Sequence, residues 1–248
     1  NIQNKNFSWF SDFSLSHNRE KIKELASGQL KDEANAWFVG EPFKVFYDYK
    51  KEGIWQLGEE AAAAANGQEP GDIKVQDVDG NGVITTDDRI IYSQRPDVTF
   101  GFNNTFNYKG FDLSVFLYAR LGQWIAYDYN TTYRINALEN GGNVDYWTPE
   151  NPTNAFPRPN KSKSYTQVTY YSTLKYEDGS FFKIRDITLG YTFKPELLKH
   201  LNLSRLRVYA TAKNFFTFSK IDNYDPEQGG SISFPMTKQL VFGLNVEF

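Results

Sequence analysis

The chain ends on a strand-like segment whose alternating side chains restrict what it can fold into. Over residues 238–248 (KQLVFGLNVEF), every second side chain is apolar: Leu240, Phe242, Leu244, Val246 and Phe248. The opposite face carries Gln239, Gly243, Asn245 and Glu247, with Val241 among them. A strand with one apolar and one polar face suits a wall between lipid and water, although a half-buried strand of a soluble sandwich has the same period.

The composition is compatible with such a wall and excludes several other classes of protein. Aromatic residues make up 17% of the 248 residues, an excess that two interfacial belts of aromatic side chains would need. No stretch approaches the roughly 20 consecutive apolar residues of a spanning helix, which excludes a helical membrane protein. A net charge of −3 argues against nucleic acid as a partner. The absence of cysteine excludes disulfides, thiolate metal sites and a cysteine nucleophile.

Six segments in all show a period of two over roughly the length of a membrane-crossing strand. They are residues 7–18, 98–108, 111–122, 182–193, 205–216 and 238–248. We expect a lipid-facing set made of Leu113, Val115, Leu117, Leu189, Leu240, Phe242, Leu244 and Val246. The set expected on the polar face is Asp112, Ser114, Asp186, Thr188, Asn245 and Glu247. The pattern predicts an all-β fold.

The connections between these segments alternate strictly between short and long. Lys109-Gly110 is a two-residue hairpin turn, and residues 194–204 form a second short link in which Pro195 can open a turn of helix. The links 19–97, 123–181 and 217–237 are much longer. This alternation is typical of an outer-membrane barrel with short periplasmic turns and long extracellular loops. Because small barrels already have about eight strands, six predict the last part of a larger barrel.

A resemblance to a known family is carried by several blocks in chain order. They are GDIKVQDVDGNGVITTDDR (71–89), FGFNNTFNYKGFDLSVFLYARLG (100–122), YWTPENPTNAFPRPN (146–160), SFFKIRDITLGYTF (180–193), LRVYATAKNFFTFSKIDNYDPE (206–227) and the closing FGLNVEF. Together they are similar to the C-terminal part of the SusC/RagA family, the TonB-dependent outer-membrane transporters of the Bacteroidetes. The resemblance spans nearly the whole chain.

The resemblance implies that residues 1–248 form the last six antiparallel strands of a 22-stranded transmembrane barrel. The signal sequence, the TonB box, the plug domain and the earlier strands are then expected upstream of residue 1, whose polar surroundings (NIQNKN) lack an export signal. The implied partners are TonB, a SusD-like surface lipoprotein, membrane lipid and an oligosaccharide or peptide substrate. The implied location is the outer membrane of a Gram-negative bacterium, and the chain is expected to perform no enzymatic chemistry.

One segment has the spacing of a calcium-binding loop. Positions 1, 3, 5, 7, 9 and 12 of the pattern are filled by Asp77, Asp79, Asn81, Val83, Thr85 and Asp88, with Gly82 at position 6. Oxygen donors at alternating positions can wrap a hard cation, and Val83 would offer its backbone carbonyl. The alternative is a metal-free turn rich in Asp and Asn, since Asp88 is shorter than the usual Glu and no long helices flank the loop. No organic cofactor is expected.

Aromatic residues crowd the first two long loops. The candidates for contact with a ligand or with a lid protein are Trp37, Tyr47, Trp55, Trp124, Tyr129 and Trp147. Aromatic faces stack on sugar rings or pack against peptides, but the same residues can form small cores within the loops. The residues also leave open a second class of function, a soluble, calcium-stabilised β-rich binding or adhesion module.

Overall fold

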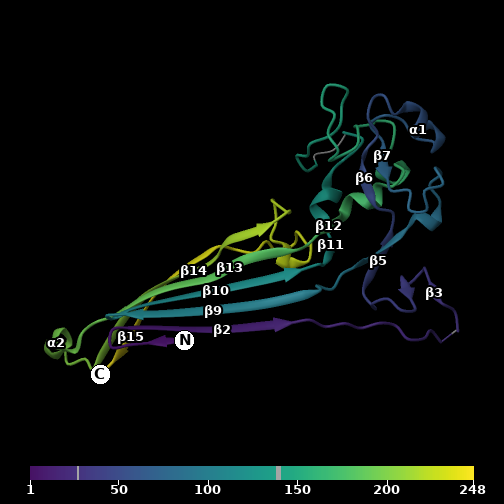
Figure 1. The fold of residues 1–248 in the computed structure, drawn as a ribbon. Helices are drawn as coiled ribbons and strands as arrows, with labels where there is room; N and C mark the ends of the chain where they lie inside the picture. The colour runs from purple at the N-terminus through teal and green to yellow at the C-terminus, as the bar shows by residue number, and fades with distance from the viewer. Residues whose placement is uncertain (27, 138–140) are drawn as a thin grey trace.

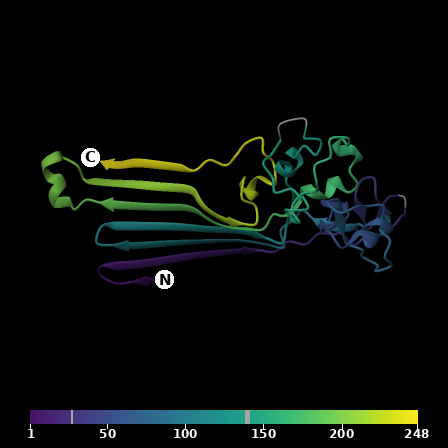
Figure 2. The ribbon, with the colours of Figure 1, turned by 90° about the horizontal axis from the view of Figure 1, so that it is seen from above.

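The computed structural model describes residues 1–26, 28–137 and 141–248. One sheet of seven antiparallel strands forms a long wall, and the long connections gather at one of its ends (Figures 1 and 2). The strand order is β1-β2-β9-β10-β13-β14-β15, so strands of this sheet that follow one another along the chain lie side by side. This arrangement is the open wall of a barrel, which these residues alone do not close.

The wall contains the six predicted strands. Its elements are β1 (Ile2–Gln3), β2 (Phe7–Ser16), β9 (Val98–Tyr108), β10 (Phe111–Leu121), β13 (Phe181–Thr192), β14 (Arg205–Ser219) and β15 (Gln239–Glu247). Each strand from β2 onward begins and ends within three residues of its prediction. The short β1 was not predicted, because a strand of two residues is too short to show an alternating pattern. It folds back on β2, with Ile2 opposite Trp9.

The strand register puts the two predicted sets of side chains on opposite faces. Leu113 lies opposite Leu189, Leu189 opposite Ala210, and Ala210 opposite Phe242, so an apolar row crosses four strands. Asp112 and its alternating neighbours lie on the other face. Opposed residues of an antiparallel pair share one face, so the alternation read from each strand is confirmed as a property of the whole sheet.

A buried polar group on the apolar face is satisfied by its neighbours. Asn104 in β9 is 8% exposed, and its side-chain oxygen accepts hydrogen bonds from Trp9 Nε1 at 3.1 Å and Ser11 Oγ at 2.7 Å. A buried acceptor without a partner would be costly on a surface that meets hydrocarbon. The two donors on β2 therefore allow an amide oxygen at this position.

The short turns have the backbone geometry that their sequences predict. Lys109 and Gly110 have φ angles of 47° and 92°, the left-handed pair of a tight hairpin turn. A side chain at Gly110 would also lie 2.8 Å from the backbone oxygen of Thr192. The second short link contains α2 (Pro195–Leu198) and the 3₁₀ turn η5 (Lys199–Leu201), as Pro195 predicts.

The long connections are folded into small elements. They are β3 (Lys31–Asp32), β4 (Trp37–Phe38), β5 (Val45–Asp48), β6 (Lys51–Ile54), α1 (Glu60–Ala65), β7 (Ile73–Val75), η1 (Thr86–Asp88), β8 (Ile90–Ser93), β11 (Trp124–Ala126), η2 (Asp128–Thr132), η3 (Tyr165–Gln167), η4 (Tyr171–Lys175), β12 (Tyr176–Asp178) and η6 (Pro226–Gln228). The first two loops share a core of Ile54, Ile73, Val75, Trp147 and Leu174. In the described ranges, no helix has the length and apolarity needed to cross a membrane.

A pair of substitutions on β10 tests the assignment of the two faces. Val115→Arg puts a charge on the apolar face and should lower the free energy of unfolding in lipid vesicles by about 2–4 kcal/mol if that face meets hydrocarbon. Ser114→Arg puts the same charge on the polar face and should cost much less. Both variants are compared with wild type by denaturant unfolding of the full-length protein. Equal costs for the two variants would contradict the assignment.

Candidate functional site

The polar face of the wall is cross-linked by charged side chains. Arg207 in β14 reaches over β13 to Asp112 in β10, with Nε–Oδ1 and Nη2–Oδ2 distances of 2.9 and 2.6 Å. Between them lies Gly190, where a Cβ atom would come within 2.6 Å of both Asp112 carboxylate oxygens and 2.5 Å of the Arg207 guanidinium. Glycine is therefore required for the bridge. Lys213 and Asp186 form a looser pair at 3.6 Å.

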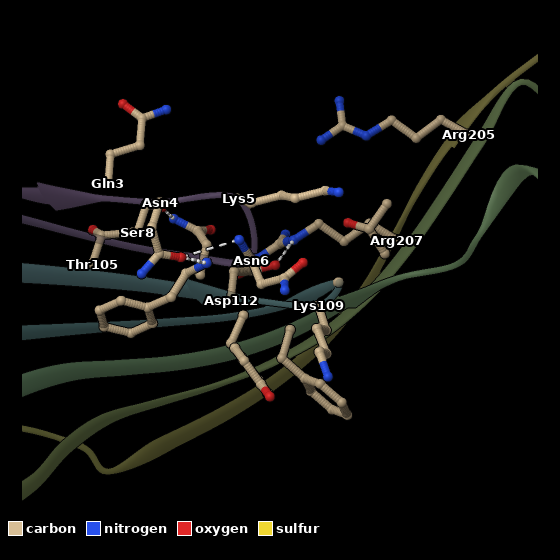
Figure 3. A pocket seen from close by; sticks show the side chains of 16 residues that line it. Gln3, Asn4, Lys5, Asn6, Ser8, Thr105, Lys109, Asp112, Arg205 and Arg207 are labelled. Carbon is tan, nitrogen blue, oxygen red and sulfur yellow. Dashed lines mark hydrogen bonds and ion pairs between the residues drawn. The ribbon is translucent and has the colours of Figure 1, made fainter.

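A basic hollow lies on this polar face at the end of the wall with the short turns (Figure 3). It has a volume of about 490 Å³, and its charged lining residues are Lys5, Lys109, Arg205, Arg207 and Asp112. Arg207 is paired with Asp112, and Arg205 reaches Glu247 at 3.1 Å. Among the residues that the structure describes, Lys5 and Lys109 have no carboxylate partner. The hollow therefore carries net positive charge.

The predicted metal loop brings three carboxylates together in the first long connection. Oxygens of Asp77, Asp79 and Asp88 lie within 4.8 Å of one another. Asp77 accepts hydrogen bonds from the backbone N–H groups of Gly80 and Gly82 at 2.8 and 2.7 Å. Both glycines have positive φ angles, 74° and 85°, which lets the backbone turn tightly around the carboxylate.

The other predicted donors lie on the same turn, but part of their capacity is used within the loop. The Asn81 side-chain oxygen accepts from the N–H of Val83 at 2.7 Å, and the Thr85 hydroxyl accepts from Asp87 N–H at 3.2 Å. Asp88 is fully buried and accepts from Thr85 N–H and Val78 N–H, each at 2.7 Å. The hydrogen bond from Thr85 is the largest cause that lowers the pKa of Asp88, and it outweighs the opposite effect of burial.

The donor set fits a hard cation such as calcium. Each carboxylate has two oxygens and about four lone-pair directions, so a carboxylate that accepts two N–H bonds can still ligate a metal. The same hydrogen bonds also make the loop a complete turn rich in Asp and Asn without a metal. The geometry is thus compatible with both readings of the sequence.

Comparison with known proteins puts this wall in a family. No protein-family model matches the chain. TonB-dependent receptor P26 of Formosa agariphila is 31% identical over the whole chain, and TonB-dependent receptor SusC of Bacteroides thetaiotaomicron is 28% identical, also over the whole chain. The chain covers 28% and 25% of these two relatives. The solved structure of the RagAB peptide transporter is similar to all of this chain, with a TM-score of 0.76 and 24% sequence identity. The match covers 28% of the RagAB chain. The chain belongs to the SusC/RagA family of TonB-dependent transporters.

Membership of the SusC/RagA family indicates what each face of the wall contacts. In an outer-membrane barrel the apolar face meets lipid and the polar face lines the lumen or meets what fills it. The relatives are receptors and transporters rather than enzymes, in agreement with the prediction that the chain performs no chemistry. The chain spans about a quarter of the length of these relatives.

Two of the predicted contact residues are part of the core of the SusC/RagA-type loops. Trp147 is 4% exposed, and its indole N–H donates to Gln56 Oε1 at 2.8 Å. Trp55 is 8% exposed, with the Lys74 ammonium 4.5 Å from its ring centroid. Their buried rings leave too little surface for a ligand, so we do not retain these two residues as contact candidates.

The other four predicted contact residues remain partly accessible. Trp37 stacks on Phe43 with ring centroids 5.7 Å apart, and Tyr47 packs on Phe38 at 4.7 Å. The second loop holds the other two, with Trp124 4.7 Å from Tyr92 and Tyr129 5.9 Å from Tyr127. Each ring thus has at least one aromatic neighbour that restricts its orientation, and Tyr129 also has Tyr224 at 6.0 Å between ring centroids.

A functional group that sequence reasoning missed is the fully buried Lys183 on the polar face of β13. Its carboxylate partners, Asp225 and Glu227, are 42 and 44 residues away in the sequence. Strict alternation from Asp186 puts Lys183 on the apolar face, and the bulge at Arg185 turns it to the polar face instead. No local pattern links Lys183 to these two carboxylates. Only the tertiary structure shows that Lys183 pairs with Asp225 and Glu227.

Asp88 should make the first loop sensitive to acid. A depressed carboxyl pKa contributes stability that is present above the unfolded value of 3.8 and is lost as pH falls through the lower native pKa. The protection of the Val78 and Thr85 amides, measured as exchange relative to the intrinsic rate at each pH, should therefore fall below pH 3.8. Asp88→Asn leaves one oxygen for two N–H donors and should cost about 1–3 kcal/mol of local stability at neutral pH. Unchanged protection of both amides in this variant would contradict the assignment.

Proposed function

We propose that the full-length protein is an active transporter that imports oligosaccharides or peptides across the outer membrane of a Gram-negative bacterium. Energy reaches it through TonB, and a SusD-like lipoprotein covers its outer opening. The main support is the amphipathic antiparallel wall, together with relatives that are named as TonB-dependent receptors over the whole chain. Residues 1–248 supply barrel wall, lumen lining and loops, with the short turns in the periplasm and the long loops outside the cell.

The proposed substrate class follows from the surfaces that the loops offer. Trp37, Tyr47, Trp124 and Tyr129 have partly accessible rings that can stack on a sugar or a peptide, or pack against the lid lipoprotein. RagAB is a peptide transporter, while this chain shares its fold at 24% identity. Both substrate classes are therefore part of the proposal.

We also propose that the loop from Asp77 to Asp88 binds calcium as a structural staple. The support is the convergence of three carboxylates on a turn with the spacing of a calcium loop. Bound calcium would neutralise the repulsion among these carboxylates and fix the segment between β7 and β8. It would supply rigidity and no catalysis.

Removal of the proposed metal should loosen the loop and leave the barrel folded. Asp77→Ala combined with Asp79→Ala should increase protease cleavage between residues 19 and 97, because only a loop staple is lost. Chelation of calcium in the wild type should have the same effect. Glu24→Ala combined with Glu52→Ala removes two exposed carboxylates of the same connection outside the turn and is the control. If neither the double variant nor chelation changes cleavage, the metal-free turn is correct.

Uptake in whole cells tests the transport function. A strain without the gene should fail to accumulate the oligosaccharides or peptides that the wild type takes up, and the full-length gene should restore uptake. Deletion of TonB should abolish uptake even when the protein is present at normal levels. Trp124→Ala should raise the half-saturation concentration by about two- to tenfold, since stacking on an aromatic ring contributes roughly 0.5–1.5 kcal/mol. Uptake that is independent of TonB would contradict the proposed function.

A further inference from the structure

The last long connection turns back over the polar face of the wall. Phe181 and Lys183 lie near the loop end of β13 on the same face as Tyr118, which is opposite Lys183 in the register. Phe181 is 1% exposed and Lys183 is fully buried, although most other described side chains of the polar face are partly exposed. The turn η6, which contains the buried Pro226, provides the groups that contact Lys183. In a barrel this face is the lumen, so η6 lies inside the mouth.

A cluster of four charges fixes η6 to the wall. The Lys183 ammonium lies 2.6 Å from Asp225 Oδ2 and 2.8 Å from Glu227 Oε2. Arg185, the extra residue of a bulge in β13, reaches Glu227 Oε1 at 3.1 Å. The two cations and two anions balance. Because Asp225 and Glu227 have side chains only 11% and 10% exposed, water contributes little to solvating any of the buried members.

Each half of this cluster depends on the other. A buried ammonium without a counter-ion is strongly destabilised, and so are two buried carboxylates that lose their cation. The wall strand cannot move, because β13 is hydrogen-bonded to both β10 and β14. Loss of the charge on Lys183 should therefore drive the loop away from the wall so that water can solvate its carboxylates.

The same connection is attached to the second loop by apolar and backbone contacts. Ile221 packs in a cluster with Ile125 and Tyr127, and the N–H of Asp128 donates to the backbone oxygen of Gly230 at 3.0 Å. These contacts lie on either side of η6 along the chain. They hold the ends of the segment, while the Lys183 cluster holds its middle against the wall.

We propose that Lys183 is a positioning residue that holds the last loop inside the mouth of the barrel, where η6 limits the size of the substrate that enters. The proposal rests on the transport function proposed above. The loop acts on the substrate, and Lys183 acts through the loop. A cluster that only stabilised the wall would leave substrate size selection unchanged.

The position of η6 can be measured with a thiol probe, because residues 1–248 contain no cysteine and labelling of the full-length parent protein gives the background from the rest of the chain. Pro226→Cys places one thiol at a buried position beside both carboxylates. In the full-length protein in outer membranes, a membrane-impermeant maleimide should label it slowly. With Lys183→Met, labelling should become about tenfold faster, as expected for local release of a loop. Lys183→Arg retains the charge and should restore slow labelling.

Two further variants make the labelling result decisive. Asp225→Asn combined with Glu227→Gln leaves the strands unaltered and should also accelerate labelling, even if Lys183→Met fails to assemble. Lys213→Met removes a lysine of the same face that pairs with Asp186 and does not contact the loop, so labelling should stay slow. Slow labelling in both cluster variants would overturn the positioning role.

Uptake of a size series of substrates tests the entry limit. Lys183→Met should increase uptake of the longest substrate relative to the shortest by about threefold or more, and Lys183→Arg should retain the wild-type ratio. Fast labelling with an unchanged ratio would overturn the size limit. Lack of uptake by the wild type as well would contradict the proposed transport function, whereas labelling would still decide whether Lys183 positions the loop.

Discussion

The architecture depends on the requirement that backbone N–H and C=O groups find partners within the protein where no water reaches them. In a bilayer each unsatisfied group costs several kcal/mol, so strands must pair continuously and the barrel must close. The wall meets this requirement by pairing each strand from β2 to β15 with its neighbour, with a bulge at Arg185. A period of two then follows away from the bulge, because each barrel strand has one side toward lipid and the other toward the lumen. Exceptions such as Asn104 occur where neighbouring donors satisfy them.

The first two long connections are stabilised mainly by contacts with each other. The first two connections share a core in which Trp147 and Leu174 of one loop pack with Ile54, Ile73 and Val75 of the other. Many of the aromatic residues therefore act as structural side chains. The three carboxylates at Asp77, Asp79 and Asp88 provide a further point at which this assembly can be stiffened.

The third connection joins these two systems. Its η6 turn is fixed to the wall through Lys183, and its ends contact the second loop. The position of η6 is thereby tied both to the wall and to the second loop, through a small number of buried ion pairs and apolar contacts.

The sequence by itself determined the strands and, away from the bulge in β13, their two faces, because alternation is local and is repeated in six segments. Its longer residue blocks indicated the family. It also placed Asp77 and its partners in one turn, since a loop of twelve positions closes on itself. Tertiary structure decided which aromatic rings are buried, as Trp55 and Trp147 show, and it brought Lys183 to Asp225 and Glu227. These outcomes depend on how distant loops pack, and side chains more than forty residues apart leave no periodic signal in the chain.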